Sequence, residues 1–168
     1  MRLTVLVENT ASDEALQCVH GLSFYLEAAG KRILFDMGPG AQFAQNAQTL
    51  GVALDRVDFA VLSHGHYDHG GGLDVFLRRN DHAPVYLRTG AFAPHTDGAG
   101  NDIGLRPALE KNPRLIFTDA LCEIAPGIRL FSQVTGRKFW SPINDELLED
   151  GVQDAFSHEQ NLLLEEDG

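Results

Sequence analysis

A chain of 168 residues, of which 43% are apolar, is long enough for one domain with a sizeable hydrophobic core. A net charge of −11 argues against a nucleic-acid partner, because binding to phosphates needs clustered lysine and arginine. No apolar run reaches the roughly 18 to 20 residues of a membrane helix, and the first residues lack the apolar core of a signal peptide.

The first half of the chain has patterns typical of alternating strands and helices. Strands are predicted over 2–8, 21–28, 32–36 and 55–63, and helices over 41–50 and 71–79. Gly30 and Lys31 form the turn of a hairpin between two of these strands. This order of elements favours a mixed α/β fold.

The second half has shorter strands and longer connections. Strands are predicted over 84–87, 115–118 and 161–165, and a hairpin over 123–131 turns at Pro126-Gly127. Two irregular stretches cover 89–113, with room for one helical turn, and 133–157. Loops of that length in a compact domain tend to carry function.

The order of the elements predicts which strand ends meet. The hairpin brings His20, before its first strand, close to Asp36, after its second. The helix over 41–50 should make strands 32–36 and 55–63 parallel neighbours. Their carboxyl ends, marked by Asp36 and His64, then share one edge of the sheet, where ligand sites gather.

Four groups able to bind a metal follow the strand that ends at Ser63, in the spacing His-x-His-x-Asp-His. They are His64, His66, Asp68 and His69. Imidazole nitrogens and a carboxylate oxygen suit zinc, iron or manganese. Glycines 70–72 allow a tight turn after them. The sequence therefore predicts a metal site on a loop at the end of a core strand.

The spacing suggests two metal ions side by side. His64 and His66 suit one ion, and Asp68 and His69 suit a second. Two close ions can share a bridging hydroxide that attacks at neutral pH. Because a catalytic zinc usually keeps three protein ligands, further ligands must come from elsewhere.

Other residues of the chain are candidates for those positions or for the substrate. His95 lies in the long loop, where it faces either the metals or a substrate, and His158 precedes the last strand. His82 lies in a turn and is predicted to be a surface residue. Asp97 and Asp102 are further candidates from the long loop.

Three polar residues are expected to support the site rather than to bind metal. Asp36 is predicted to anchor the loop or a metal-bound histidine. His20 is likewise predicted to lie behind the metal ligands without binding the metal itself. Tyr67 is expected either to bind substrate through its hydroxyl or to pack.

The cluster, together with Phe35-Asp36-Met37-Gly38, resembles the metallo-β-lactamase superfamily. His20-Gly21-Leu22-Ser23 and His158-Glu159-Gln160 are similar to the branch of dihydropterin-ribofuranosylaminobenzene phosphate synthase-like proteins. The resemblance implies an αββα sandwich with two divalent ions, zinc first and iron or manganese as alternatives. It also implies that His64 and His66 bind the first metal, and that Asp68 and His69 contribute to the second.

The end of the sequence departs from the family pattern. Family members continue into a strand that carries a histidine in a Gly-Cys-x-His context, whereas this sequence stops at Asp167-Gly168. Residues 1–168 are therefore expected to be the N-terminal part of the domain. Apolar surface left uncovered would favour a homo-oligomer or a completing partner chain.

We expect a metal-dependent hydrolase in which a metal-bound hydroxide attacks a small ester, phosphoester or pterin-linked substrate. The positive charge of a metal would accommodate an anionic substrate. Asp68 is expected to orient the attacking water as the catalytic residue. The alternative is a catalytically silent metal-binding fragment that needs a partner chain to complete its site, and a third hypothesis is a nucleic-acid-processing relative. Two isolated cysteines, Cys18 and Cys122, suggest no disulfide framework and so a reducing, cytoplasmic setting.

Overall fold

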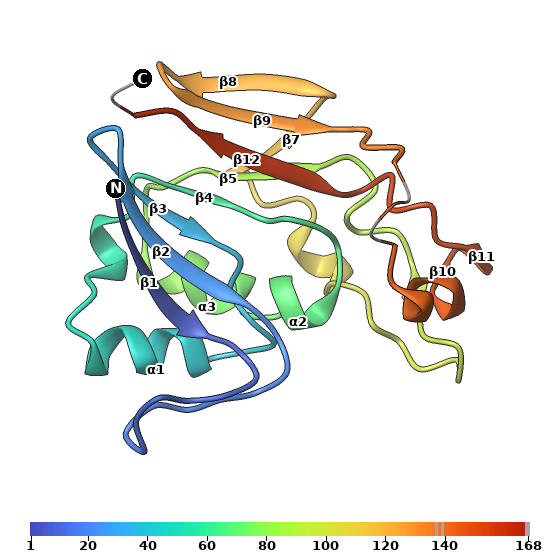
Figure 1. Cartoon of the computed structure of the whole chain (residues 1–168), viewed down its shortest axis with the longest axis horizontal. Coiled ribbons are helices and arrows are strands. Elements are labelled where there is room, and N and C mark those ends of the chain that lie inside the picture. The colour runs from blue at the N-terminus through green and yellow to red at the C-terminus, as the bar shows by residue number, and fades with distance from the viewer. Residues whose placement is uncertain (137, 139, 167–168) are drawn as a thin grey trace.

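A computed structural model describes residues 1–136, 138 and 140–166, and Figure 1 shows their arrangement. The larger sheet has six strands in the order β1 (Arg2–Val7), β2 (Ser23–Ala28), β3 (Lys31–Phe35), β4 (Phe59–Val61), β5 (Val85–Arg88) and β7 (Leu115–Thr118). A second sheet has the order β12 (Gln160–Leu164), β9 (Ile128–Ser132) and β8 (Leu121–Ala125). A small third sheet joins β11 (Val152–Gln153), β10 (Leu148–Glu149) and β6 (His95–Thr96).

The helices are short. They are α1 (Gln42–Thr49), α2 (Tyr67–Gly70) and α3 (Leu73–Arg79), with 3₁₀ turns η1 (Leu54–Arg56), η2 (Pro107–Leu109) and η3 (Pro142–Glu146). None of the helices in the described ranges is long and apolar enough to cross a bilayer. The predicted mixed α/β fold is confirmed.

The pairing of the strands confirms the predicted topology. Strands β2 and β3 are antiparallel, with Ala28 opposite Lys31 at the turn. Strands β3 and β4 are parallel, with Ile33 opposite Phe59. The carboxyl ends of β3 and β4 therefore lie at the same edge of the sheet, as the crossover rule predicts.

Three local predictions were wrong in detail. The strand expected over 55–63 is shorter, because residues 54–56 form η1. Leu54 of η1 and Val57, just after it, are both buried in the core that contains Phe43 and Phe76. The loop expected after His66 contains a helical turn, α2. The irregular stretch 133–157 contains η3, β10 and β11, whose two-residue strands are too short to show a period. The hairpin expected at the end of the chain involves Asp167 and Gly168, which lie outside the described residues.

Alternation along the central strands creates two hydrophobic layers. Leu34 of β3 and Ala60 of β4 face a core that contains Phe43 of α1 and Phe76 of α3. Their neighbours on the opposite face pack against the second sheet in a separate core, whose buried members are Leu26, Ile33, Phe59, Val61, Ile128 and Leu130. A strand buried on both faces reads as a continuous apolar run, which is why residues 59–62 carry no polar side chain.

The second sheet has an outward face that is partly apolar. Leu121 of β8 lies opposite Phe131 of β9, and these side chains are 71% and 37% exposed. Leu163 of β12 is 44% exposed. Figure 1 shows the helices on the other side of the molecule, beneath the large sheet.

Gln160 joins the second sheet to the first. Its buried side-chain amide donates to the carbonyl oxygens of Leu62 and Tyr86, at 2.9 and 3.0 Å. The hydroxyl of Thr118 donates to its amide oxygen at 2.7 Å. Its backbone N–H donates to the carbonyl of Ser63 at 2.8 Å. The start of β12 is thus fixed beside the end of β4.

Substituting Gln160 by alanine should lower the free energy of unfolding by about 1–3 kcal/mol, because buried carbonyl groups lose their donor. Urea unfolding measures the change. Asn161→Ala is the matched control: Asn161 is half-buried, and among the described residues its side chain has one hydrogen bond, of 3.5 Å, to Glu159. An equal loss in both variants would contradict a bridging role for Gln160.

Candidate metal centre

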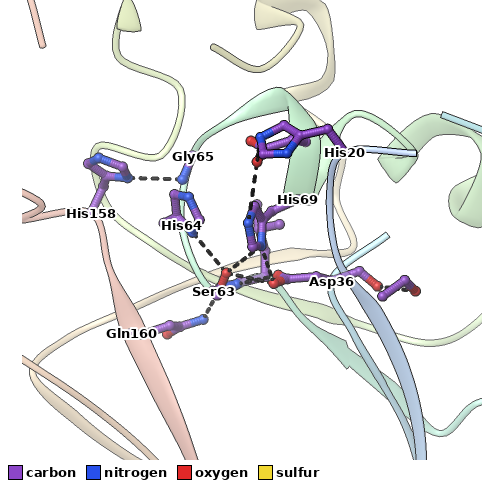
Figure 2. A network of polar contacts seen from close by, with 11 residues as sticks. His20, Asp36, Ser63, His64, Gly65, His69, His158 and Gln160 are labelled. Carbon is purple, nitrogen blue, oxygen red and sulfur yellow. Dashed lines mark hydrogen bonds and ion pairs between the residues drawn. The ribbon is translucent and has the colours of Figure 1, made fainter. Parts of the chain in front are cut away.

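The polar residues predicted from the sequence gather where β3 and β4 end (Figure 2). Asp36 follows β3, Ser63 and His64 follow β4, and His158 lies just before β12. The loop makes a close backbone approach at Gly65, where a Cβ atom would stand 2.2 Å from the carbonyl oxygen of Ala91. Glycine at this position lets the motif pack against the loop that leads to His95.

Asp36 organises the loop from beneath. It is fully buried and has φ 58°, a left-handed conformation that Asp and Asn tolerate better than most residues. Its carboxylate accepts hydrogen bonds from the backbone N–H of Ser63 at 2.7 Å, the hydroxyl of Ser63 at 2.7 Å and Nδ1 of His69 at 2.6 Å. The expected role of Asp36 as an anchor agrees with these contacts.

These hydrogen bonds set the tautomers of two histidines. His69 donates from Nδ1 to Asp36, so its Nε2 keeps a free lone pair. The single hydroxyl proton of Ser63 goes to Asp36, so Ser63 accepts from Nδ1 of His64 at 2.9 Å. His64 therefore also presents an unprotonated Nε2. An outer partner that fixes the tautomer is the usual arrangement for histidines that bind metals.

His64, Asp68 and His69 form a half-buried group of possible metal ligands, which we call the outer group. Nε2 of His69 lies 3.5 Å from Oδ2 of Asp68, and Nε2 of His20 lies 3.4 Å from the same oxygen. The rings of His64 and His69 are 4.2 Å apart. His20 is exposed, and it touches the group from outside.

A second set, the inner group, is fully enclosed and consists of His66, His95, Asp154 and His158. Oδ2 of Asp154 lies 3.4 Å from Nε2 of His66, 3.5 Å from Nδ1 of His95 and 3.1 Å from Nε2 of His158. Ligands around a tetrahedral zinc, at bonds of about 2.0–2.1 Å, stand roughly 3.3 Å apart. The observed separations are close to that value.

Unpartnered nitrogens show that the inner group suits a cation. His95 is 0% exposed, yet neither of its ring nitrogens has a hydrogen-bond partner among the described residues. Nε2 of His66 is likewise buried and lacks one. Buried polar atoms are normally satisfied, so Nε2 of His66 and the one unprotonated nitrogen of a neutral His95 could each donate a lone pair to a cation. A divalent cation fits this donor set.

The electrostatics favour neutral imidazoles at His64 and His66 beside a charged carboxylate. Burial alone would lower the pKa of His69, but its hydrogen bond with Asp36 and the negative charges of Asp36 and Asp68 raise that pKa. Burial lowers the pKa of His64 and of His66, and neighbouring histidines lower the pKa of His64 further. Burial alone would raise the pKa of Asp154, but its contacts with His158, His66 and His95 hold that pKa well below its usual range. Neutral imidazole and ionised carboxylate are the protonation states that bind metal.

The donors are grouped differently from the pairs expected along the motif. His66 lies with His95 and Asp154 rather than in the group of His64. The turn of α2 explains this, because it folds Asp68 and His69 back over His64. The two groups still adjoin, since the rings of His64 and His66 are 4.7 Å apart.

The other candidates belong to neither group. Tyr67 is 42% exposed. His82 is exposed beside Asp81, as predicted. The carboxylates of Asp97 and Asp102 accept hydrogen bonds from their own loop, from Asn101 and Gly104 respectively.

Asp154 was not among the candidate site residues predicted from the sequence. Its signal was the spacing to His158, four residues later, within a stretch that otherwise lacks a pattern. A single aspartate in an acidic segment looks like a surface residue, so only its 0% exposure reveals its role.

Comparisons with known proteins agree with this geometry. The sequence profile described as the metallo-beta-lactamase superfamily matches residues 16–160. A crystal structure titled Tm1679, a metal-dependent hydrolase of the beta-lactamase superfamily, superposes with a TM-score of 0.77 at 27% identity, over 96% of this chain and 60% of that one.

Two curated relatives come from Methanocaldococcus jannaschii. An uncharacterised protein is 41% identical over 78 residues, which are 46% of this chain and 30% of that protein. The 7,8-dihydropterin-6-methyl-4-(beta-D-ribofuranosyl)-aminobenzene-5'-phosphate synthase is 35% identical over 79 residues, 44% of this chain and 27% of the enzyme. The match thus spans less than a third of each curated relative.

Proposed function

Because the chain belongs to the metallo-β-lactamase superfamily, we propose that it is a metal-dependent hydrolase acting on a small anionic ester or phosphoester. The observation that carries this proposal is the pair of adjoining donor groups, one enclosed and one half-buried, at one sheet edge. Zinc is the first choice for both, with iron or manganese as alternatives, since histidine and carboxylate suit all three.

Bound divalent cations would supply a water of lowered pKa and polarise the electrophilic centre of the substrate. The protein residues prepare the two positions. Asp36 and Ser63 hold His64 and His69 with Nε2 unprotonated. We assign the orientation of the attacking water to Asp68, whose carboxylate is partly accessible and lies beside His20 and His69.

A cleft lined by Phe156, whose ring lies 5.7 Å from those of His66 and His158, offers a place for the substrate. It has a volume of about 950 Å³, and Phe156 and Trp140 contribute its aromatic surface. The ring of Phe156 also lies 6.2 Å from that of His64, which links the cleft to the donors. The lining carries charges of both signs, on Lys138 and Glu159. A pterin-linked phosphate is one candidate, in keeping with the name of the synthase relative.

The second candidate is a catalytically silent metal-binding domain completed by a partner chain. It is favoured by the apolar side chains that the second sheet exposes on its outward face, Leu121, Phe131 and Leu163. The outward apolar face of β8, β9 and β12 is where a second copy or a completing chain would pack.

The free thiols, Cys18 and Cys122, fit a reducing, cytoplasmic setting.

Metal analysis and hydrolysis, measured on the same preparation, separate the two candidates. We expect bound metal together with hydrolysis of bis(p-nitrophenyl) phosphate or p-nitrophenyl acetate that a chelator abolishes. Asp68→Asn should reduce the rate by roughly 10²–10⁴-fold, while Asp81→Asn, an exposed control, should leave it unchanged. Metal binding without turnover would favour the silent domain, and cleavage of RNA in a parallel assay would overturn the small-molecule assignment.

A further inference from the structure

Phe156 has a backbone conformation that bulky side chains rarely adopt. Its φ is 53°, in the left-handed region, where a residue with a large side chain is strained. The surrounding turn holds it there. The backbone N–H of Phe156 donates to Oδ1 of Asp154 at 2.6 Å, and its carbonyl oxygen accepts from the N–H of Glu159 at 3.1 Å. Strain that the fold maintains in this way is concentrated at active sites and ligand clamps.

The strained turn places the phenyl ring of Phe156 beside the histidines of the motif. The ring centroid lies 5.7 Å from that of His66 and 6.2 Å from that of His64. The ring also stacks with His158, with centroids 5.7 Å apart and planes 22° apart. Phe156 is half-buried and lines the cleft of about 950 Å³. One ring therefore borders both the candidate metal ligands and the cleft.

Trp140 forms a corner with Phe156 in the same cleft. The two ring centroids are 5.6 Å apart and the ring planes lie at 88° to each other. The indole Nε1–H donates to Oδ1 of Asp145 at 2.9 Å, and the same oxygen accepts from the side-chain amide of Gln153 at 3.1 Å. These hydrogen bonds orient the indole. The corner is therefore formed in advance, which lowers the cost of ordering side chains when a ligand binds.

The lining of the cleft favours an aromatic ligand over a merely charged one. Among the described residues of the lining, charge is confined to Lys138 and Glu159, which have opposite signs. A flat ring in the corner can stack on one aromatic side chain and turn its edge toward the other. These are the two arrangements that aromatic pairs prefer. A saturated ring of equal size has no such arrangement.

We propose that Phe156 and Trp140 determine the specificity of the site by holding a flat aromatic ring, so that the substrate is an aryl or heteroaryl ester or phosphoester. This inference rests on the proposed function for the reaction and names its substrate class. With the ring in the corner, the ester or phosphate group extends past Phe156 toward His64 and His66. The reacting group then lies on the side where the candidate metal ligands are.

Binding of two phosphonates, followed by the fluorescence of Trp140, tests the proposal without turnover. Trp140 is the single tryptophan of the sequence, so its emission reports on the cleft. The probes are phenylphosphonate and cyclohexylphosphonate, added to the zinc-loaded protein; both have a six-membered ring, which is flat only in the first. We expect phenylphosphonate to bind about 2–10-fold more tightly, as an aromatic pair contributes beyond its buried area. Equal affinities, or unchanged emission with phenylphosphonate, would overturn the proposal.

Phe156→Leu assigns the preference to this residue. Leucine keeps an apolar side chain at the same strained backbone position but has no ring, so the ratio of the two affinities should fall toward one. Phe131→Leu is the matched control, because Phe131 is exposed on β9 and is not among the described residues that line the cleft. Its ratio should equal that of the parent protein. An unchanged ratio in Phe156→Leu, or an equal fall in both variants, would contradict the role of Phe156.

The substrate class and the hydrolase fail by different results. A preference for phenylphosphonate in a protein that hydrolyses no ester would refute the hydrolase and leave the aromatic corner standing. Ester hydrolysis by a protein that binds the two phosphonates equally would refute the aryl substrate and leave the hydrolase standing.

Discussion

Asp36→Ala should lower the free energy of unfolding by about 3–5 kcal/mol, the cost of breaking a buried pair and leaving its partners unpaired. The alanine removes the acceptor for the N–H and hydroxyl of Ser63 and for Nδ1 of His69. It also places a Cβ without a polar group at φ 58°, where the backbone is strained. Urea unfolding in the presence of a chelator measures this loss separately from any effect of metal.

Asp36→Asn separates the stability of the loop from its metal chemistry. Asparagine tolerates the positive φ and still accepts from the N–H of Ser63, so the stability loss should be smaller. Its amide N–H₂ would face Nδ1 of His69, which then has to accept. The proton of His69 moves to Nε2 and blocks that nitrogen as a ligand. A variant that keeps full metal content at the outer group would contradict this role for Asp36.

His66→Ala is expected to reduce the metal content to half of that of the parent protein or less. Nε2 of His66 is buried without a hydrogen-bond partner in the part of the chain that the structure describes, and it lies 3.4 Å from Oδ2 of Asp154. The inner group would keep too few donors to hold an ion, and the His64 ring, 4.7 Å away, would lose its neighbour. Elemental analysis of protein purified without added metal gives the ratio.

The matched control for that experiment is His82→Ala. His82 is also a histidine, but it is exposed and its ring contacts only the neighbouring Asp81 among the ion pairs of the described residues. Its removal should leave the metal content unchanged. Full retention of metal by the His66 variant would show that the inner group does not hold an ion.

How much could be predicted depended on how far apart in sequence the interacting residues lie. The parallel pairing of β3 and β4 followed from a short helix between two strands, and it placed Asp36 next to the motif correctly. The turn of α2 did not follow, because four residues of mixed polarity show no helical period. Without that turn, the position of the His69 ring next to that of His64 could not be predicted.

The sequence by itself determined a set of potential metal ligands and the edge of the sheet where they lie, because His64, His66, Asp68 and His69 fall within six residues after one buried strand. Only the tertiary structure decided how those donors are divided and which distant residues join them. Asp154 and His95 reach His66 from segments with no pattern of their own. The physical reason is that burial and hydrogen bonding across long separations, such as the contact of Gly65 with His158, arise when the two sheets pack together, and no local spacing encodes them.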